Sequence, residues 1–156
     1  MTMVAGGNHH DTPEVTVAVL CARDGRLLCI EEWNHGRLVL NQPAGHLEPG
    51  ESLLEAAVRE TREEAGWQVR VTALVGIYQW TSSHSGVRYL RVAFAAEALD
   101  EIPDAVLDTG IERALWLTPD ALHAQAERHR SPLVWRAVTD YLGGQRAPLS
   151  LLHLAP

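Results

Sequence analysis

The sequence predicts an α/β fold of the α+β type, in which a mixed β-sheet lies between covering helices. Two observations lead to this prediction. Val- and Leu-rich runs of strand length recur along the chain, and one longer amphipathic segment between them carries the end signals of a helix. Two further helix starts follow in the last third of the chain. We therefore expect a single sheet with helices packed against it.

The chain is expected to open with a tail and then a hairpin. Residues 1–12 are polar and Gly-rich, which predicts a disordered N-terminal tail ahead of a single domain over residues 13–156. Apolar runs at 14–22 and 27–30 flank Asp24-Gly25, a two-residue turn signal. In that hairpin Cys21 and Cys29, the only cysteines, face opposite sides of the sheet. A disulfide is therefore not expected, and free thiols fit a reducing compartment.

The amphipathic segment is a helix whose two ends can be read from the sequence. Ser52 and Glu55 form a Ser-x-x-Glu capping box, and Gly66 ends the helix. Within it, Glu63 and Glu64 lie about 60° and 40° to either side of Glu60. Their carboxylates can converge on one hard cation, so we expect Mg²⁺ here, with Mn²⁺ as a possible substitute. The alternative is a solvated face of paired charges.

The remaining elements follow in order. Strands are expected over 69–78, 87–96 and 114–117. Thr118-Pro119 and Ser131-Pro132 each place an N-cap before a proline at the first helical position, which predicts two further helices. Gly143 is expected to end the last of them.

Composition narrows the possible functions. The 156 residues carry a net charge of −7, which disfavours binding to a nucleic-acid polymer. All 13 basic residues are arginine, so Schiff-base chemistry and a P-loop lysine are excluded. We expect a small phosphorylated substrate. Because no signal-peptide or membrane-spanning stretch is visible, we expect a cytoplasmic protein without membrane contact, and a monomer or a homodimer.

The helix and the loop before it resemble the signature of the Nudix hydrolase family. The matching residues are Gly45, Glu51, Arg59, Glu60, Glu63, Glu64 and Gly66. Thr61 and Trp67 depart from it, because the family prefers aliphatic residues there. The resemblance implies a Nudix-like α/β/α sandwich and a metal held by Glu60, Glu63, Glu64 and the backbone carbonyl of Gly45.

The resemblance extends over most of the chain to the NudJ phosphatases, a Nudix subfamily. It includes Asn41 to Glu48, Gln79-Trp80, Arg91, Asp108 and Arg130 to Val134. It implies release of terminal phosphate from nucleoside tri- and diphosphates and from thiamine or thiamine-precursor (hydroxymethylpyrimidine) pyrophosphate. Alternatives are a Nudix pyrophosphohydrolase acting on ADP-ribose, dinucleoside polyphosphates or oxidised nucleotides, and a non-catalytic Nudix ligand-binding module.

These observations assign site residues in two groups. Arg59 should orient carboxylates, and the general base is left open among Glu63, Glu64 and two acids of one loop, Asp108 and Glu112. Catalytic assignments are Glu63, Glu64, Arg59 and Glu112. Substrate-binding assignments are Trp80 for stacking and Arg91, Arg37 and Arg88 for phosphate; Tyr78 and Trp33 are further stacking candidates, whereas Trp116 and Trp135 are expected to be structural.

Overall fold

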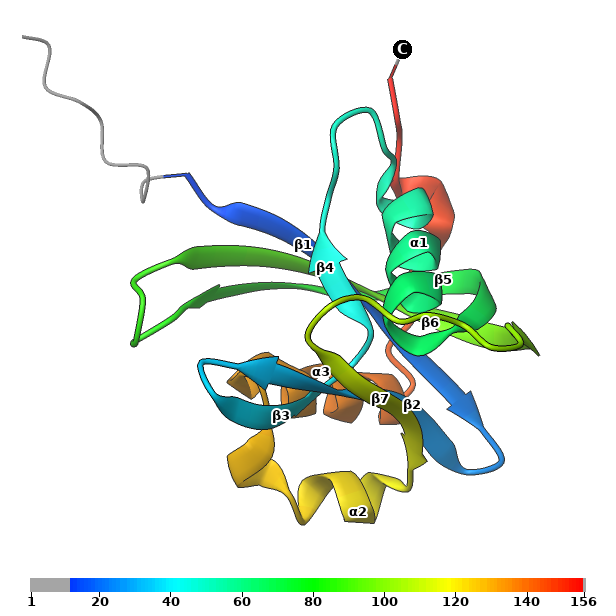
Figure 1. Cartoon of the computed structure of the whole chain (residues 1–156). Helices are drawn as coiled ribbons and strands as arrows, with labels where there is room; N and C mark the ends of the chain where they lie inside the picture. The colour runs from blue at the N-terminus through cyan, green and yellow to red at the C-terminus, as the bar shows by residue number, and fades with distance from the viewer. Residues whose placement is uncertain (1–11, 156) are drawn as a thin grey trace, which may run out of the picture.

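The computed structural model describes residues 12–155 and shows one mixed sheet with helices on both faces (Figure 1). The predicted disordered tail therefore falls, except for Thr12, outside the described residues. The strands are β1 (Glu14–Arg23), β2 (Arg26–Asn34), β3 (Arg37–Asn41), β4 (Ala44–His46), β5 (Trp67–Thr81), β6 (Arg88–Glu101) and β7 (Ile111–Leu117). The helices are α1 (Leu53–Ala65), α2 (Pro119–His123) and α3 (Pro132–Leu142), with 3₁₀ turns η1 (Ala126–Arg128) and η2 (Leu149–Leu151).

The sheet is mixed because one of its central pairings is parallel. Its strand order is β3-β2-β1-β6-β5, with β4 paired to β1 and β7 to β2. Strands β1 and β6 run parallel, and the other pairs are antiparallel. This is the predicted α/β fold with a mixed sheet.

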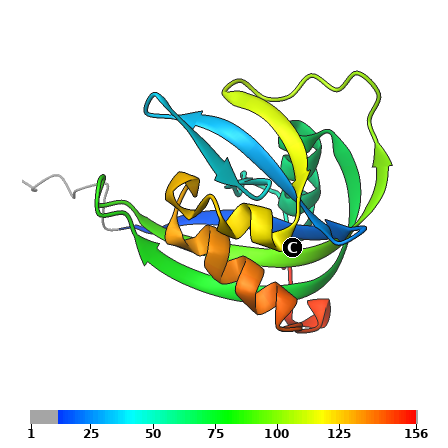
Figure 2. The same cartoon turned by 90° about the horizontal axis from the view of Figure 1, so that it is seen from below.

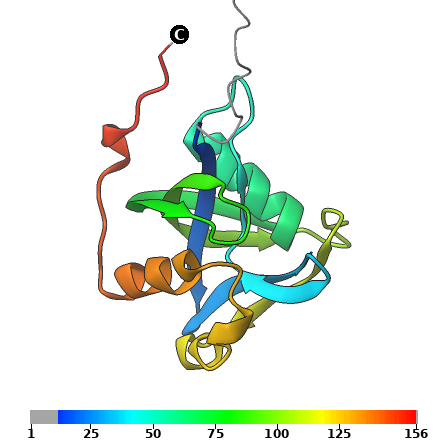
Figure 3. The same cartoon turned by 90° about the vertical axis from the view of Figure 1, so that its left-hand side faces the viewer.

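Strand β1 supplies both hydrophobic cores because successive side chains point to opposite faces. Val17, Val19 and Cys21 pack with α1, whereas Ala18 and Leu20 pack with α2 and α3. In Figures 1 and 3, α1 and α3 accordingly lie on opposite sides of the central strands, and Figure 2 shows α3 lying across them. Buried on both faces over residues 16–21, β1 anchors the neighbouring strands.

The predicted hairpin turn and helix caps are confirmed. Asp24 and Gly25 have φ values of 51° and 74°, and Ser52 and Glu55 form both bonds of the capping box. Gly66 ends α1 with φ 69°. Thr118 and Ser131 cap α2 and α3, and Gly143 ends α3. The two cysteines are free and belong to different cores.

The strands are longer than predicted. Strand β2 continues past residue 30 to Asn34, and β7 begins at Ile111. Strand β5 extends beyond the predicted range at both ends, and β6 continues past residue 96 to Glu101. Charged residues obscured these extensions. Glu31 and Glu32 of β2 look like a break in an apolar run, but they pair with β3 and β7 across a bulge. Backbone pairing therefore continues where the hydrophobic pattern stops.

Candidate functional site

Helix α1 presents Glu60 directly to the short strand β4. A Cβ atom built on Gly45 would lie 2.2 Å from both Cδ and Oε1 of Glu60, far closer than any real contact. Glycine therefore lets the backbone of β4 approach this carboxylate where it stands. Any larger residue at position 45 would displace the end of the Glu60 side chain.

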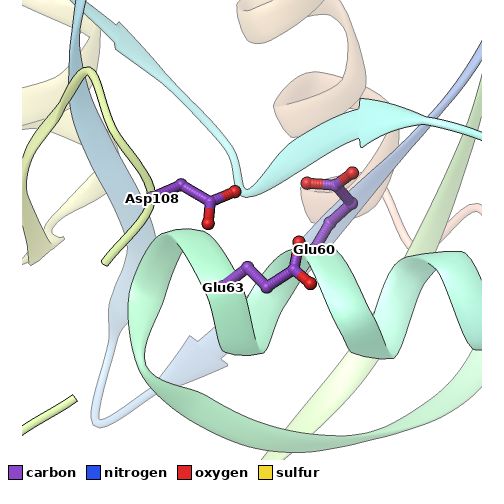
Figure 4. Close-up of side chains that lie close together, drawn as sticks. All are labelled: Glu60, Glu63 and Asp108. Carbon is purple, nitrogen blue, oxygen red and sulfur yellow. The ribbon is translucent and has the colours of Figure 1, made fainter. Parts of the chain in front are cut away.

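The loop before β7 brings a third acid to α1. The Asp108 N–H donates to the Glu63 carbonyl oxygen at 2.9 Å, which fixes the loop against the end of the helix. Figure 4 shows the carboxylates of Glu60, Glu63 and Asp108 facing a common space, and they offer oxygens that all lie within 4.8 Å of one another. We call these three residues the carboxylate cluster. A cavity of about 380 Å³ opens over it.

Glu64 lies next to the cluster and is buried, at 5% exposure. Its Oε1 accepts a hydrogen bond from the Ala44 N–H at 3.0 Å. Burial, together with the nearby carboxylates of Glu32 and Glu60, raises the pKa of Glu64 to about 9. Burial likewise raises the pKa of Glu60. Glu60 and Glu64 are thus held where the nearby positive charge is too small to stabilise both ionised carboxylates.

Arg59 is the cation that organises the acids on this side of α1. Its Nε and Nη2 donate to the two carboxylate oxygens of Glu51 at 2.6 and 3.0 Å. Its Nη1 donates to Glu60 at 2.9 Å and to Glu63 at 3.1 Å, and Nη2 also reaches the His46 carbonyl oxygen at 3.0 Å. The hydrogen bonds that Arg59 donates to Glu51 raise the pKa of Arg59, so the guanidinium stays charged. One arginine therefore positions several carboxylates without neutralising all of them.

The donor set fits a hard divalent cation. The cluster supplies only oxygen ligands, the kind that Mg²⁺ and Mn²⁺ prefer. The acids outnumber the guanidinium groups that reach them, since Arg59 bonds Glu51, Glu60 and Glu63 and Arg62 lies 4.0 Å from Glu63. Gly45 leaves room for a backbone approach. Glu64 contacts Ala44 and so stands at the back of the cluster rather than among its three converging residues.

Glu112 is placed differently from Asp108, although both were considered from sequence. Its Oε2 accepts a hydrogen bond from the Trp33 indole Nε1 at 2.8 Å. Trp33, Asp108 and the segment 109–111 line the cavity over the cluster, whereas Glu112 does not. The expectation that both acids occupy one loop is therefore wrong for Glu112, which lies in β7, while the loop directs Asp108 to the cluster.

A larger cleft of about 680 Å³ holds Trp80, one of the three aromatic residues predicted for stacking, whereas Trp33 lines the cavity over the cluster. Trp80 lies against Tyr89 with ring centroids 5.7 Å apart and planes 18° from parallel. Arg37 lines the same cleft, as does Trp135, which sequence reasoning had taken as structural. We call this cavity the aromatic cleft. Tyr89 was missed because only the register of β5 with β6 places it opposite Trp80.

The other predicted residues lie elsewhere. Tyr78 packs in the core and donates to Asp140 at 2.8 Å, and Trp116 packs edge-on against Trp67 with centroids 5.3 Å apart. Arg88 begins β6, outside the lining of the described cavities.

Arg91 lies in a small chamber between the carboxylate cluster and the aromatic cleft. This chamber, of about 210 Å³, is lined by Thr16, Asn41 and Arg91 among others. Arg91 is only 8% exposed, and its Nε and Nη1 have no hydrogen-bond partner among residues 12–155. Burial lowers the pKa of Arg91 to about 10. We call this cavity the Arg91 chamber.

Comparison with known proteins identifies the family. The family model described as NUDIX domain matches residues 11–136. The chain belongs to the Nudix family. Phosphatase NudJ of Escherichia coli (strain K12) is 37% identical over 140 residues, which cover 90% of both chains. A NUDIX hydrolase from Nitrosomonas europaea has 44% identity and a TM-score of 0.90, and the match covers 92% of this chain and 98% of that one.

A more distant structure shares the Nudix fold. The MutT NUDIX hydrolase from Burkholderia pseudomallei has a TM-score of 0.71 at 21% identity, over 83% of this chain and 98% of that one. The chain is thus a Nudix hydrolase, with homology to NudJ phosphatases. Within residues 12–155, no helix is long and apolar enough to cross a bilayer.

Proposed function

We propose that this Nudix hydrolase is a Mg²⁺-dependent, NudJ-like phosphatase that releases terminal phosphate from small substrates. The proposed substrates are nucleoside tri- and diphosphates and the pyrophosphates of thiamine or its hydroxymethylpyrimidine precursor. The observation that carries this proposal is the carboxylate cluster, whose oxygens lie within 4.8 Å of one another beside two cavities that can receive the rest of a substrate. The likeness to Phosphatase NudJ over 90% of both chains supports the choice of reaction.

Glu60, Glu63 and Asp108 would hold the metal, with Glu64 and the Gly45 carbonyl as further proposed ligands. When bound, Mg²⁺ draws charge from phosphate oxygens and eases loss of a proton from water; Mn²⁺ can replace it. Arg59 keeps Glu60 and Glu63 in place through bonds of 2.9 and 3.1 Å.

The general base is proposed among Glu63, Glu64 and Glu112. Glu63 is best placed, because it is partly exposed and faces the cavity over the cluster. Glu64 is turned toward Ala44, and Glu112 would first have to release the indole of Trp33. Glu63 is therefore the proposed base, which accepts the proton of the attacking water.

The organic part of the substrate is proposed to bind away from the cluster. Trp80 offers a face for stacking beside Tyr89 in the aromatic cleft. Arg91, Arg37 and Arg88 are the proposed phosphate contacts.

We also propose that the protein is a single domain over residues 13–156, that it is a monomer or homodimer, and that it has no nucleic-acid polymer as partner. We propose a cytoplasmic location, and the two free buried cysteines are in keeping with a reducing compartment.

The test is a substrate panel assayed with Mg²⁺ and with EDTA, in which orthophosphate and pyrophosphate are measured separately. The panel contains nucleoside tri- and diphosphates, thiamine and hydroxymethylpyrimidine diphosphates, ADP-ribose and diadenosine polyphosphates. We expect metal-dependent orthophosphate from the first two groups. Pyrophosphate as the main product from nucleoside triphosphates, or nucleoside monophosphate from ADP-ribose and diadenosine polyphosphates, would contradict terminal phosphate release. No turnover at all would favour a binding module.

A further inference from the structure

The three cavities form one path along the molecule. The Arg91 chamber shares Gly45 and His46 with the cavity over the carboxylate cluster. At its other end it shares Trp80 and Arg130 with the aromatic cleft. A linear molecule that begins at the cluster must therefore pass Arg91 before it reaches Trp80.

Arg91 is a buried cation without a partner. Its Nε and Nη1 make no hydrogen bond within the described part of the chain. The carboxylates of Glu32 and Glu64 are near enough to favour its charge, yet burial outweighs them and the pKa still falls. Glu32 is already engaged, since it accepts from Asn41 at 3.2 Å and pairs with Arg130 at 3.5 Å. Leaving a buried hydrogen-bonding group unpaired destabilises the fold, and more so when the group is charged.

The surroundings of Arg91 suit an anion. Thr16, its neighbour in the β1–β6 register, has a buried hydroxyl that likewise lacks a partner among residues 12–155. Arg130 and Ser131, the N-cap of the 11-residue helix α3, line the same chamber. Two guanidinium groups, a hydroxyl and the positive end of a helix thus meet in a chamber whose lining contains one carboxylate, Glu32, with Glu64 behind it. Asn41 Oδ1 adds one buried acceptor without a partner among the described residues.

We propose that the Arg91 chamber is a subsite for an inner phosphate of the substrate, and that it determines which phosphoanhydride bond lies at the carboxylate cluster. The proposal rests on the proposed phosphatase function and deepens it. With the phosphate next to the terminal one on Arg91 and the organic group on Trp80, the terminal phosphate lies at the cluster. The outermost phosphate is then the one attacked.

This binding order has a defined chemical outcome. A water oxygen bonds to the terminal phosphorus, and the bond from that phosphorus to the bridging oxygen breaks. The electron pair of the broken bond stays on the bridging oxygen, which leaves with the phosphate held by Arg91. The water proton passes to a carboxylate and then to solvent. The products are orthophosphate and a substrate shortened by one phosphate.

The experiment compares wild type with Arg91→Gln, Arg91→Lys and the control Arg70→Gln, whose arginine is 66% exposed and pairs with Glu97. Binding of a nucleoside diphosphate in EDTA is followed by tryptophan fluorescence, and thermal unfolding is followed in parallel. Loss of a charge-assisted contact to phosphate should weaken binding about 10- to 100-fold in Arg91→Gln. Its melting temperature should not fall, because an unpaired buried charge has been removed. Arg91→Lys keeps the charge but loses the planar guanidinium, so its affinity should lie between those of wild type and Arg91→Gln.

A second readout is the ratio of orthophosphate to pyrophosphate released from a nucleoside triphosphate with Mg²⁺. We expect Arg91→Gln to lower this ratio about tenfold, because the phosphate chain is no longer held in one position. Unchanged binding in Arg91→Gln would overturn the proposal, as would weaker binding accompanied by a lower melting temperature, which indicates a structural arginine. If wild-type protein releases only pyrophosphate, terminal phosphate release fails, whereas the Arg91 subsite is still decided by the binding titration in EDTA.

Discussion

Two buried glutamates of this protein, Glu31 and Glu64, have nearly the same exposure, 4% and 5%, and opposite electrostatic surroundings. Glu31 accepts hydrogen bonds from Arg113 at 2.6 Å and from Arg128 at 2.7 Å, and these hold its pKa below the ordinary value. Glu64 has one backbone N–H and two neighbouring carboxylates, and burial raises its pKa to about 9. Two guanidinium groups donate hydrogen bonds to Glu31, whereas within residues 12–155 Glu64 accepts from a backbone N–H and from no arginine.

The difference separates structural from ligand-binding acids. The Glu31 ion pairs join β2 to β7 and to η1, so they tie neighbouring elements together. The acids around Glu64 come together at an open cavity, where a cation from solution can supply the missing charge. Burial alone does not distinguish the two roles, but the partners of each carboxylate do.

The largest effect should follow from neutralising the acids beside the cavity. We expect Glu63→Gln and Glu64→Gln each to lower kcat/KM about 100- to 1000-fold, because a metal site supplies several kcal/mol of transition-state stabilisation. Both variants should remain folded in EDTA, because Gln keeps the size of Glu and because Glu64, with its pKa raised to about 9, carries no charge near neutral pH. Glu63→Gln loses only a partly exposed ion pair with Arg59. Phosphate-release kinetics and thermal unfolding check both points. Full activity in both variants would rule out the assigned site.

The arginine that orients these acids should come next. Arg59→Lys keeps the charge but cannot bond both Glu51 oxygens and reach Glu60 and Glu63 at the same time. We expect activity to fall about 10- to 100-fold, as for other groups that orient metal ligands. Steady-state kinetics at increasing Mg²⁺ concentrations measure this change, and wild-type activity in Arg59→Lys would contradict the orienting role.

Replacing Glu31, the glutamate compared with Glu64 above, should lower stability rather than activity. Glu31→Gln leaves Arg113 and Arg128 without a carboxylate, so the free energy of unfolding should fall by about 1–3 kcal/mol while the folded fraction stays active. Chemical denaturation measures this loss. Glu97→Gln is the control, because Glu97 is 57% exposed and its change should stay within about 0.5 kcal/mol. A loss of activity without a loss of stability in Glu31→Gln would erase the distinction between the two glutamates.

A smaller effect should appear at low pH. The folded-state pKa of Glu31 lies below the unfolded value of 4.5, so its stabilisation is complete above that pH and disappears as the pH falls through the folded value. The stability difference between wild type and Glu31→Gln should therefore be constant near neutrality and shrink below about pH 4. Denaturation curves at pH 7 and pH 3 measure it. An equal difference at both values would contradict the ionic role of Glu31.

The sequence was sufficient where local signals decide the structure. The capping box at Ser52, the turn at Asp24-Gly25 and the Thr118 and Ser131 caps were all predicted and are all present. Each depends on residues within a few positions of one another, so no tertiary information was needed. The acids of α1 were recognised for the same reason, because helical spacing alone brings them together.

The rest depends on contacts between distant segments. Asp108 joins Glu63 only because its loop bonds to the end of α1, and nothing in the loop sequence separates it from Glu112. The Arg91 chamber combines β1, β3 and β6, so Thr16 and Asn41 become candidates only once the strand register is known. Sequence patterning predicts which faces are buried but does not identify the unpaired polar atoms there.

The most direct test of the carboxylate cluster is calorimetric titration of Mn²⁺ into metal-free protein, using wild type, Glu60→Gln and the exposed control Glu97→Gln. A divalent-cation site at Glu60, Glu63 and Asp108 predicts that wild type and Glu97→Gln bind Mn²⁺ equally well. Glu60→Gln should bind at least about tenfold more weakly, which corresponds to 1.4 kcal/mol or more. Equal affinity in all three proteins, or no binding by wild type, would contradict the assignment.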